Sequence, residues 1–553
     1  MGVETEYAIR CKQNASSAGA ALNFDRLSAS LACTTPIAPS FRNPYRLFIA
    51  NGGCISLETG ASPSMAHAML ESATPECHSP RELLGYQLSM EKLLSEVVSS
   101  TFVEQEAYLL KGSADAHGHT YGQHESYEMS IAKGPMLICW RLGLLLMLPA
   151  LISYRFLVAL CFVLIWLASE VIDLMGRSVR CIRKSAFKSP ASSARSPVKS
   201  KSMHPSSFAP RWVSLCASGL RILHWPLAIM LWTNIYCFAL RPQRRYLSAF
   251  LASRCIVDGA GYLDKENRYW VSARASTINS VIGFGSYGPS CPLFRCDSWL
   301  RGLCVGPLWS LGNYAQLFGS RQRVEIAIGD SGMCEQSQYV RLGSTALVLD
   351  LVERVIPKVP HLKNPVEAIG RFARDWMLLT SVPDRAQRQW TSLDIQHAYA
   401  AAVRQMLQSK SSVPIEAWKI LDQWQSTLNQ LHPTDDESNL PRAMLGRIDW
   451  LSKLWLLHQT NKDATWQARK KIDLRYHELS SNGYHRRLNE TLELAPILDP
   501  FEISRSKRTP PVGSPAAQRG YLIREFAGPE CNLHVDWTHA EFVFEGKKRR
   551  VKF

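Results

Sequence analysis

The sequence predicts an α+β fold in which short strands and helices are interrupted by a separate apolar insert. Three patterns carry this prediction. The opening residues alternate, so that Glu4 and Glu6 share one face of a short strand. Apolar residues recur at helical spacing over 80–101 and through much of 343–480. Between these regions, residues 133–240 contain two apolar runs on either side of a basic stretch rich in serine and proline.

The composition narrows the class of protein. A chain of 553 residues is too long for one ordinary core, and its 46% hydrophobic content suffices for two or more. Residues 177–211 hold nine Lys and Arg and no acid, and without them the net charge falls from +16 to +7, so we expect no nucleic-acid partner. The 15 cysteines form no CxxC pair and no secretory signal is visible. We therefore expect reduced thiols, a cytoplasmic catalytic part and no structural zinc.

The opening strand is a candidate metal-binding strand. Two carboxylates that face the same way, here Glu4 and Glu6, repel each other unless a cation or a proton lies between them. Mg²⁺ prefers oxygen ligands of this kind and often bridges to nucleotide phosphates. A solvated edge strand is the alternative that the spacing alone leaves open.

The patterns divide the chain into a catalytic domain, an insert and a C-terminal domain. Residues 1–132 and 241–480 combine strands with helices, and we expect them to form one catalytic domain around the insert 133–240. Residues 481–553 contain a basic linker at 504–508, and we expect a small domain there that packs over the site. The expected elements are helices Ser344–Val355, Leu393–Leu407, Ile415–Leu431 and Arg442–His458, and strands near 533–537 and 541–544.

The insert is apolar enough to interact with a membrane. Its first run, Met136–Ala168, is broken only by Arg141 and Arg155, and its second, Ile222–Leu240, carries no formal charge. A run of about 20 apolar residues can cross a bilayer. A helical insert that packs on the enzyme remains open, but we favour membrane association through 136–240.

The topology of the insert has two solutions. Two full spans would place the basic stretch 177–211 outside, against the tendency of positive loops to stay inside. A hairpin of 136–154 and 156–175, with 212–240 lying in the interface, avoids that conflict. We expect the basic stretch to be disordered and to contact anionic lipid.

Several stretches of the chain follow, in order, the motifs of one known family. The stretches are Met1–Tyr7, Asn51–Glu58, Glu71–Cys77, Asp115–Tyr127, Phe250–Arg254, Gly259–Gly261, Ile328–Asp330, Arg341–Leu349, Ile448–Lys453, Asp473–His477 and Val535–His539. Together, over residues 1 to about 540, they resemble the proteasome accessory factor A family, which contains the Pup–protein ligase and the Pup deamidase. The deamidase branch carries a long extra loop after its opening strand, and Ala8–Ala50 is too short for it, so the chain is closer to the ligase branch.

The resemblance implies a glutamine-synthetase-like fold, with a curved antiparallel sheet and helices on one face. It implies an ATP-dependent ligase that activates the C-terminal Glu of the ubiquitin-like protein Pup as an acyl phosphate, which a substrate lysine then attacks. ATP and Mg²⁺ are the implied cofactors, and Pup and lysine-bearing proteins are the implied partners. A Pup deamidase or depupylase, and a catalytically weak Pup-binding membrane adapter, remain alternatives.

The resemblance also assigns metal and catalytic roles to individual residues. Glu4 and Glu71 stand at metal-ligand positions, and Glu6 and His124 are further metal candidates. Glu58 stands where the family has its catalytic Asp, the base that prepares the incoming lysine or water. For His124, a hydrogen-bonded structural role is the alternative.

Nucleotide contacts are implied at three positions. Thr74 and Trp537 stand at contact positions of the family, and an indole can stack on adenine. Arg341 falls at a basic position where a phosphate contact is the expectation. A turn hydroxyl for Thr74 and a core position for Trp537 are the structural alternatives.

The chain departs from the family pattern at the same site. Glu58 replaces the catalytic Asp and is one methylene longer, Cys54 replaces an Arg that contacts nucleotide, and Ser56 replaces a metal-linked Tyr. A misplacement of about 1 Å can lower a rate about 10²-fold. These departures leave reduced or altered catalysis open.

Overall fold

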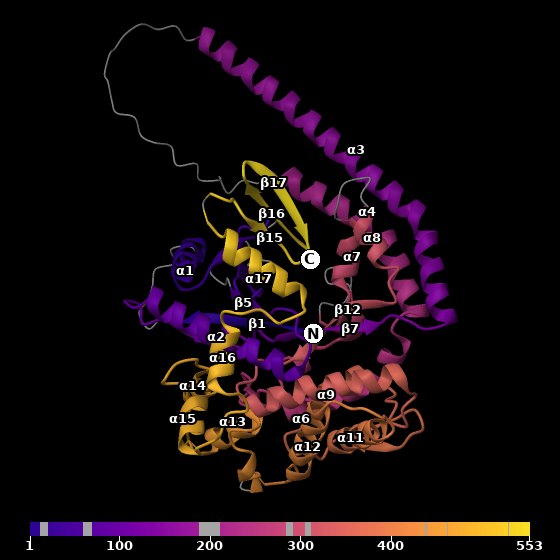
Figure 1. Ribbon diagram of the computed structural model, residues 1–553, viewed down its shortest axis with the longest axis vertical. Coiled ribbons are helices and arrows are strands. Elements are labelled where there is room, and N and C mark those ends of the chain that lie inside the picture. Colours follow the sequence, from indigo (N-terminus) through magenta and orange to yellow (C-terminus); the bar gives the residue numbers. More distant parts are fainter. Residues whose placement is uncertain are drawn as a thin grey trace. The chain divides into compact units, whose positions relative to one another are not determined.

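The computed structural model describes residues 1–10, 20–41, 43–58, 69–186, 211–283, 291–304, 311–436, 439–461, 463–528 and 530–553. The chain divides into two units, whose elements are labelled in Figure 1. The first comprises 1–130, 242–296 and 323–553, and the second comprises 131–241 and 297–322. Residues 481–553 thus fall within the first unit, and 297–322 join the insert.

A ten-stranded sheet forms the centre of the first unit, counted over the described residues. Its order is β10-β11-β12-β7-β1-β5-β4-β3-β2, and β6 also pairs with β1. Strands β1 to β5 pair antiparallel with their neighbours, β7 pairs antiparallel with β1, and β10 and β11 pair in parallel. The strands are β1 (Gly2–Arg10), β2 (Ile37–Pro39), β3 (Arg46–Ile49), β4 (Cys54–Glu58), β5 (Met69–Ala73), β6 (Tyr108–Leu110), β7 (Gln123–Ser130), β10 (Ser280–Gly283), β11 (Pro292–Arg295) and β12 (Arg321–Gly329).

One face of the central strands is apolar and is covered by α1 (Ala20–Thr34) and α2 (Pro80–Thr101). Alternate residues of the strands, such as Tyr7, Ile55 and Leu70, pack there with apolar residues of both helices. The predicted helix 80–101 is confirmed. It begins after Ser79, whose side chain accepts the N–H of Glu82, and it has proline at its first position.

The first unit contains further helices before and after β12. The predicted start at Ser344 is wrong, because α9 begins at Glu335 and its first turns bury polar residues such as Arg341 that interrupt the apolar pattern. The predicted helix Arg442–His458 is split, since Gly446 lies at φ +71° between a short 3₁₀ turn and α13. The helices are α5 (Ser248–Ser253), α6 (Cys255–Asp258), α9 (Glu335–Arg354), α10 (Pro365–Phe372), α11 (Ser392–Gln408), α12 (Ile415–Gln430), α13 (Asp449–His458), α14 (Trp466–Tyr476) and α15 (Tyr484–Thr491).

The last segment of the chain packs on the central sheet. Apolar residues of α17 (Pro515–Phe526) and of a three-stranded sheet form a core cluster with Phe48, Cys54 and Ala73. The expected basic linker at 504–508 is partly helical, because Asp499 caps α16 (Pro500–Ser506). The small strands are β15 (His534–Val535), β16 (His539–Phe544), β17 (Lys547–Lys552), β8 (Tyr262–Leu263), β9 (Tyr269–Trp270), β13 (Ser381–Pro383) and β14 (Gln389–Thr391).

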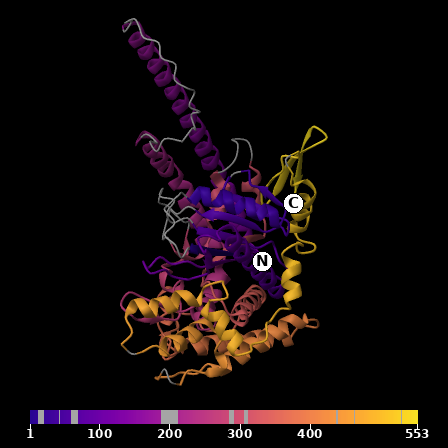
Figure 2. The ribbon, with the colours of Figure 1, turned by 90° about the vertical axis from the view of Figure 1, so that its left-hand side faces the viewer.

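The second unit is helical. It contains α3 (Pro135–Ala186), α4 (Arg211–Phe238), α7 (Asp297–Cys304) and α8 (Gly312–Gln316). Figure 1 shows α3 as one continuous helix, and Figure 2 shows its outer part from another side. The hairpin of 136–154 and 156–175 is therefore wrong, since Arg155 continues the helix and donates to the carbonyl of Leu303.

Two expectations for the insert concern its basic stretch and its membrane spans. Part of the expected disordered stretch, 177–186, belongs to α3, and the rest up to 210 lies outside the described residues.

Within the described residues, one helical segment is long and apolar enough to cross a bilayer. It is Pro135–Cys161, with a mean hydropathy of 2.1 and 22% of its most apolar window buried.

We predict that Gly52→Ala lowers the free energy of unfolding by about 1–3 kcal/mol. Gly52 has φ +83°, and an added Cβ would lie 2.7 Å from Ala516 Cβ, where the β3–β4 turn meets α17. Urea denaturation provides the measurement. Gly370→Ala is the control, because its Cβ would meet nothing within 4 Å and a helical alanine should stabilise α10 by about 0.5–1 kcal/mol. Equal midpoints for Gly52→Ala and wild type would contradict the prediction.

Candidate functional site

The central strands place acidic side chains in rows on the face of the sheet opposite α2. Glu6 of β1 lies directly across from Glu71 of β5, and Glu71 lies directly across from Ser56 of β4. Direct antiparallel partners point to the same face. The Ser56 hydroxyl donates to Glu71 Oε2 at 3.1 Å. These three residues therefore form one polar row across three strands.

A second row lies two residues away on β1. Glu4 pairs with Ala73 of β5 and His124 of β7, and Ala73 pairs with Cys54 of β4. Glu58, at the end of β4, shares the face by alternation and is exposed. We call this surface the acidic face, and its predicted site residues are Glu4, Glu6, Glu58, Glu71 and His124.

Crowding of the carboxylates changes their proton affinity. Burial, and then the charges of Glu4 and Glu58, raise the pKa of Glu71 to about 8. Burial and the charge of Glu6 also raise the pKa of Glu58. Because like charges on one face repel, the carboxyl of Glu71 retains a proton near neutral pH unless a cation takes the proton's place.

His124 lies between two carboxylates of this face. Its Nδ1 is 3.0 Å from Glu325 Oε1, and its Nε2 is 3.8 Å from Glu6 Oε1. Burial alone would lower the pKa of His124, but the two carboxylates raise it to about 10. Likewise burial would raise the pKa of Glu6, but His124 lowers it. With this raised pKa, His124 is a cation near neutral pH in the metal-free protein. Because a histidine ligates metal only when it is neutral, the metal role of His124 stays a prediction.

Three residues that the sequence did not single out complete the acidic face. Glu325 of β12 is the direct partner of Arg295 on β11, whose Nη1 lies 2.9 Å from Glu325 Oε1. Arg323 donates to Glu4 Oε1 at 2.7 Å. The polar alternation of 321, 323 and 325 is a sequence signal for such a strand, but it does not reveal which strands lie beside β12.

A further cation, Arg46, lies at the end of the first row. It is the direct partner of Ser56 on β3, so its side chain shares the face with Glu71. Its Nε is buried and has no hydrogen-bond partner among the described residues. Beside it, burial raises the pKa of the Cys54 thiol, while the Arg46 charge opposes that rise. Cys54 is therefore neutral, and Arg46 supplies positive charge at this end of the face.

Trp537 lies at the same end. Its indole meets Phe48 edge-on, with ring centroids 5.1 Å apart and planes at 78°. Phe48 is the direct partner of Cys54. Arg519 of α17 lies 4.7 Å from the centroid of the Trp537 ring and is ion-paired with Glu76 at 2.6 Å. The partly buried indole is thus held beside the second row.

The other two predicted nucleotide contacts differ in position. The Oγ1 of Thr74 accepts the N–H of Val3 at 3.0 Å, which fixes the buried hydroxyl next to β1. Arg341 is fully buried on α9, where it lies 3.7 Å from Glu125 and donates to the carbonyl of Asp330. Glu125 neighbours His124 on β7 and faces the other side of the sheet. The structure does not bring Arg341 to the acidic face.

One tight group of metal-ligating atoms is found among the described residues, and it lies outside this face. It consists of Cys334, Asp449 and His485, whose ligand atoms lie within 4.8 Å of one another. Asp449 already accepts the N–H of Cys334 at 3.0 Å and the hydroxyl of Tyr476 at 3.0 Å. These bonds give the cluster a structural role at the start of α9.

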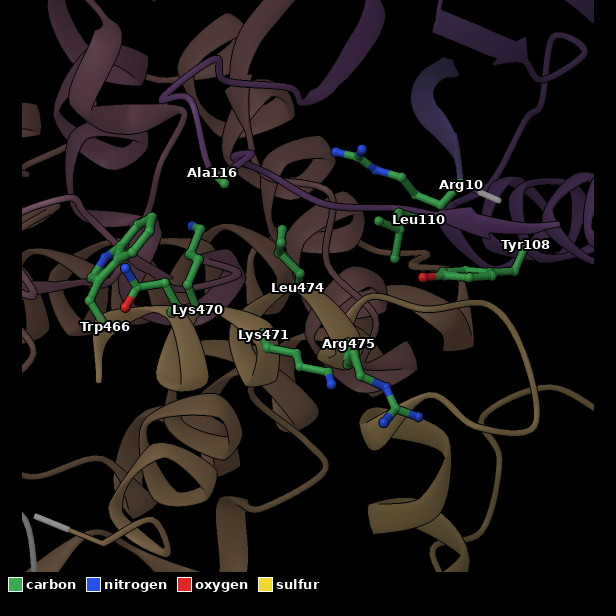
Figure 3. A pocket seen from close by; sticks show the side chains of 10 residues that line it. Arg10, Tyr108, Leu110, Ala116, Trp466, Lys470, Lys471, Leu474 and Arg475 are labelled. Atoms are coloured by element: carbon green, nitrogen blue, oxygen red, sulfur yellow. The ribbon is translucent and has the colours of Figure 1, made fainter. Parts of the chain in front are cut away.

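A cavity of about 320 Å³ opens beyond the acidic face, where β1 ends (Figure 3). Arg10 lines it from β1, and Lys470, Lys471 and Arg475 line it from α14. Asp473 pairs with Lys470 and Glu478 pairs with Arg475, so two of the four charges are balanced. The described lining contains no acid, which favours an anionic ligand.

Comparisons with known proteins agree over the whole chain. A family profile described as Pup-ligase protein matches residues 1–541. A Pup–protein ligase of Acidimicrobium ferrooxidans is 24% identical over 560 residues, which cover 97% of this chain and 91% of the relative.

Solved structures share the fold. A complex between the prokaryotic ubiquitin-like protein Pup and its ligase PafA has a TM-score of 0.65 at 17% identity and covers 100% of this chain and 88% of that chain. A Pup ligase PafA in complex with ADP has a TM-score of 0.58 at 17% identity, covering 92% and 86%. The glutamine-synthetase-like fold that the sequence implied is confirmed.

We predict that Glu71→Gln alters the pH dependence of stability. The folded pKa near 8 exceeds the ordinary value of 4.5, so the native state binds more protons than the unfolded state between these values. The stability that Glu71 contributes is complete below pH 4.5 and is lost as the pH rises through 8. Wild type should therefore lose Tm relative to Glu71→Gln between pH 5 and pH 9 in metal-free buffer. Glu266→Gln, at an exposed glutamate, is the control, and parallel curves for Glu71→Gln and wild type would refute the assignment.

Proposed function

Because the chain belongs to the Pup-ligase family, we propose that it is an ATP-dependent ligase that joins the C-terminal glutamate of Pup to lysine side chains of target proteins. The observation that carries the proposal is the acidic face. Carboxylates from β1, β4 and β5 meet there, and burial together with the charges of the neighbouring carboxylates raises the pKa of Glu71 to about 8. A sheet that only supports a fold has no need to collect like charges on one surface.

The donors of the acidic face fit a hard divalent cation. Glu4, Glu6 and Glu71 offer only oxygen atoms, and the proton that Glu71 retains is one that a cation would displace. These three residues would hold Mg²⁺, which, when bound with ATP, neutralises charge on the phosphoryl group. His124 and Arg323 hold Glu6 and Glu4 in place from β7 and β12, on one side of β1.

Glu58 acts as the general base. A lysine ammonium has a pKa near about 10.4, so it must lose a proton to become a nucleophile. Glu58 is exposed at the end of β4, where an incoming side chain can reach it. Its raised pKa brings its proton affinity closer to that of the amine, which makes proton transfer more favourable.

Arg46 and Trp537 bind the nucleotide from the other end of the face. Ser56 lies on the strand next to Arg46, and Glu71 lies one strand further. At the usual strand spacing, the backbones of Arg46 and Glu71 are about 10 Å apart. Its guanidinium can reach phosphate oxygens held above the row and takes over the charge that the family has at the position of Cys54. The Trp537 indole offers a flat apolar surface to the adenine.

We place the first unit in the cytoplasm. The cysteines for which the structure gives a state are all free, including the exposed Cys33. A reducing compartment keeps such thiols free, whereas secreted proteins usually pair them.

We predict that Glu58→Gln reduces ligation by about 10²- to 10⁴-fold and leaves nucleotide affinity unchanged. The variant keeps the size of the side chain and removes its basicity. Purified protein, Pup, a lysine-bearing target and Mg·ATP are incubated, and the shifted target band is followed on a gel. Glu266→Gln should behave as wild type. Full activity of Glu58→Gln would remove Glu58 from the mechanism, and ammonia or Pup release without ATP turnover by wild type would identify a hydrolase instead.

We predict that Arg46→Ala weakens ADP binding by about 10- to 100-fold, because a charge-assisted hydrogen bond contributes about 1.5–3 kcal/mol. Calorimetric titration with Mg·ADP measures the affinity directly. Arg46→Lys should retain part of it, and Arg388→Ala, in an exposed hairpin, should have no effect. Wild-type affinity in Arg46→Ala would exclude a phosphate contact while leaving the ligase assignment intact.

A further inference from the structure

The α3–α4 pair of the second unit is a closely packed helical hairpin with a buried seam. Leu144 and Leu151 of α3 and Leu231 and Ile235 of α4 are fully buried or nearly so. At Gly143 the helices approach so closely that an added Cβ would lie 2.1 Å from an amide oxygen of α4. The two helices of this hairpin therefore bury a core between them, and the side chains on their outer surfaces are not part of that core.

Both helices also carry large apolar side chains on their outer surfaces. These residues recur at spacings of three and four, which places them on one side of each helix. We call them the outer stripes. They are Ile138, Leu142, Leu145, Ile152 and Phe156 on α3, with Leu146 beside them, and Ile222, Trp225, Ile229, Trp232 and Tyr236 on α4.

Beyond Arg155, α3 exposes apolar side chains on several sides at once. Exposed residues there include Phe156, Leu157, Leu160 and Val163. An apolar helix of this kind belongs either in a protein core or in a lipid bilayer. The most apolar window of Pro135–Cys161 is only 22% buried, which excludes a core helix for this segment.

Two charges interrupt the apolar run. Arg141 is exposed near the start of α3 and donates to the carbonyl of Phe318, whereas Arg155 does not face outward. The Arg155 side chain is 5% exposed, and its Nε and Nη2 donate to the carbonyl of Leu303 at 3.2 and 3.0 Å. Its charge is turned toward α7, so the outer stripes continue past this position. Such a large exposed apolar surface is unusual for a soluble protein and marks an interaction site.

The sequence around the hairpin indicates which partner covers it. Residues 177–211 hold nine Lys and Arg and no acid. Positive charge next to an apolar surface is attracted to anionic lipid headgroups. Trp225, Trp232 and Tyr236 on the outer stripe are residue types that favour the boundary between headgroups and acyl chains. A protein partner would explain the apolar surface but not this combination with basic charge.

We propose that the outer stripes of α3 and α4 insert into an anionic lipid bilayer and anchor the protein to the membrane surface. The apolar side chains fill packing defects between the lipids, and the positive charge of this part of the sequence attracts the anionic headgroups. The proposal rests on the second unit alone and does not depend on the ligase activity of the first.

Flotation of the full-length protein with vesicles tests the anchor. Vesicles of phosphatidylcholine are compared with vesicles that also contain phosphatidylserine, and we expect a larger floated fraction with the anionic lipid, reduced by added salt. The triple variant Leu142→Gln, Leu146→Gln and Ile229→Gln should lower the floated fraction about tenfold or more. The matched control is Ile356→Gln, Ile415→Gln and Val512→Gln, at residues of the first unit that are 81%, 74% and 82% exposed. It should float as wild type does.

Three results would overturn the proposal. One is wild-type protein that stays out of the vesicle fraction in a detergent-free buffer. Another is a triple variant that floats as well as wild type while its circular dichroism spectrum shows a folded protein. The third is a lipid-independent dimer, seen by light scattering, that the triple variant dissociates, because a second copy of the chain would then cover the outer stripes.

Discussion

The candidate site depends on the register between β1, β5 and β4. Glu6, Glu71 and Ser56 meet because they are direct partners on neighbouring strands. Their in-between neighbours, such as Tyr7 and Leu70, are buried against α1 and α2 on the other face. A slip of one residue would turn the carboxylates into that apolar layer and expose the core residues instead. The hydrophobic burial on one face thereby fixes the crowding of charge on the other.

The C-terminal segment adds a second constraint to the same strands. Phe48, Cys54 and Ala73 lie on the acidic face, but they are apolar and form a core cluster with α17 and the small sheet. The buried Arg519 donates to the carbonyl of Gly52 and lies over the Trp537 ring. The acidic face therefore has two parts along β4, an apolar part at Cys54 and an acidic part at Glu58. Its apolar end is closed by the C-terminal segment, and its acidic end remains accessible at Glu58.

Local patterns in the sequence were sufficient for some of this architecture. Alternation placed Glu4 and Glu6 on one face, and the helical spacing of apolar residues over 80–101 predicted α2. The family resemblance added Glu58 and Glu71, whose place beside β1 depends on pairing across distant segments. Arg46 and Glu325 escaped notice because their roles come only from the strands that lie next to them. Arg341 lies away from the acidic face, and the residue type does not tell on which side of the sheet a helix places it.

Near Arg46, the departures of the sequence from the family pattern can be understood as a redistribution of charge. Cys54 is buried and its raised pKa keeps it neutral, so no cation remains at that position of β4. Arg46 lies on the adjoining strand, and its buried Nε lacks a hydrogen-bond partner within the described chain. An unsatisfied guanidinium nitrogen in a protein interior is unfavourable unless a ligand completes its bonding. The carboxylates on β1 and β5 need positive charge from a ligand. Glu71 retains a proton there, and a bound cation would relieve the repulsion between the carboxylates in its place. The magnesium–nucleotide complex proposed for this face carries both signs of charge in one ligand and would satisfy both ends of the face together.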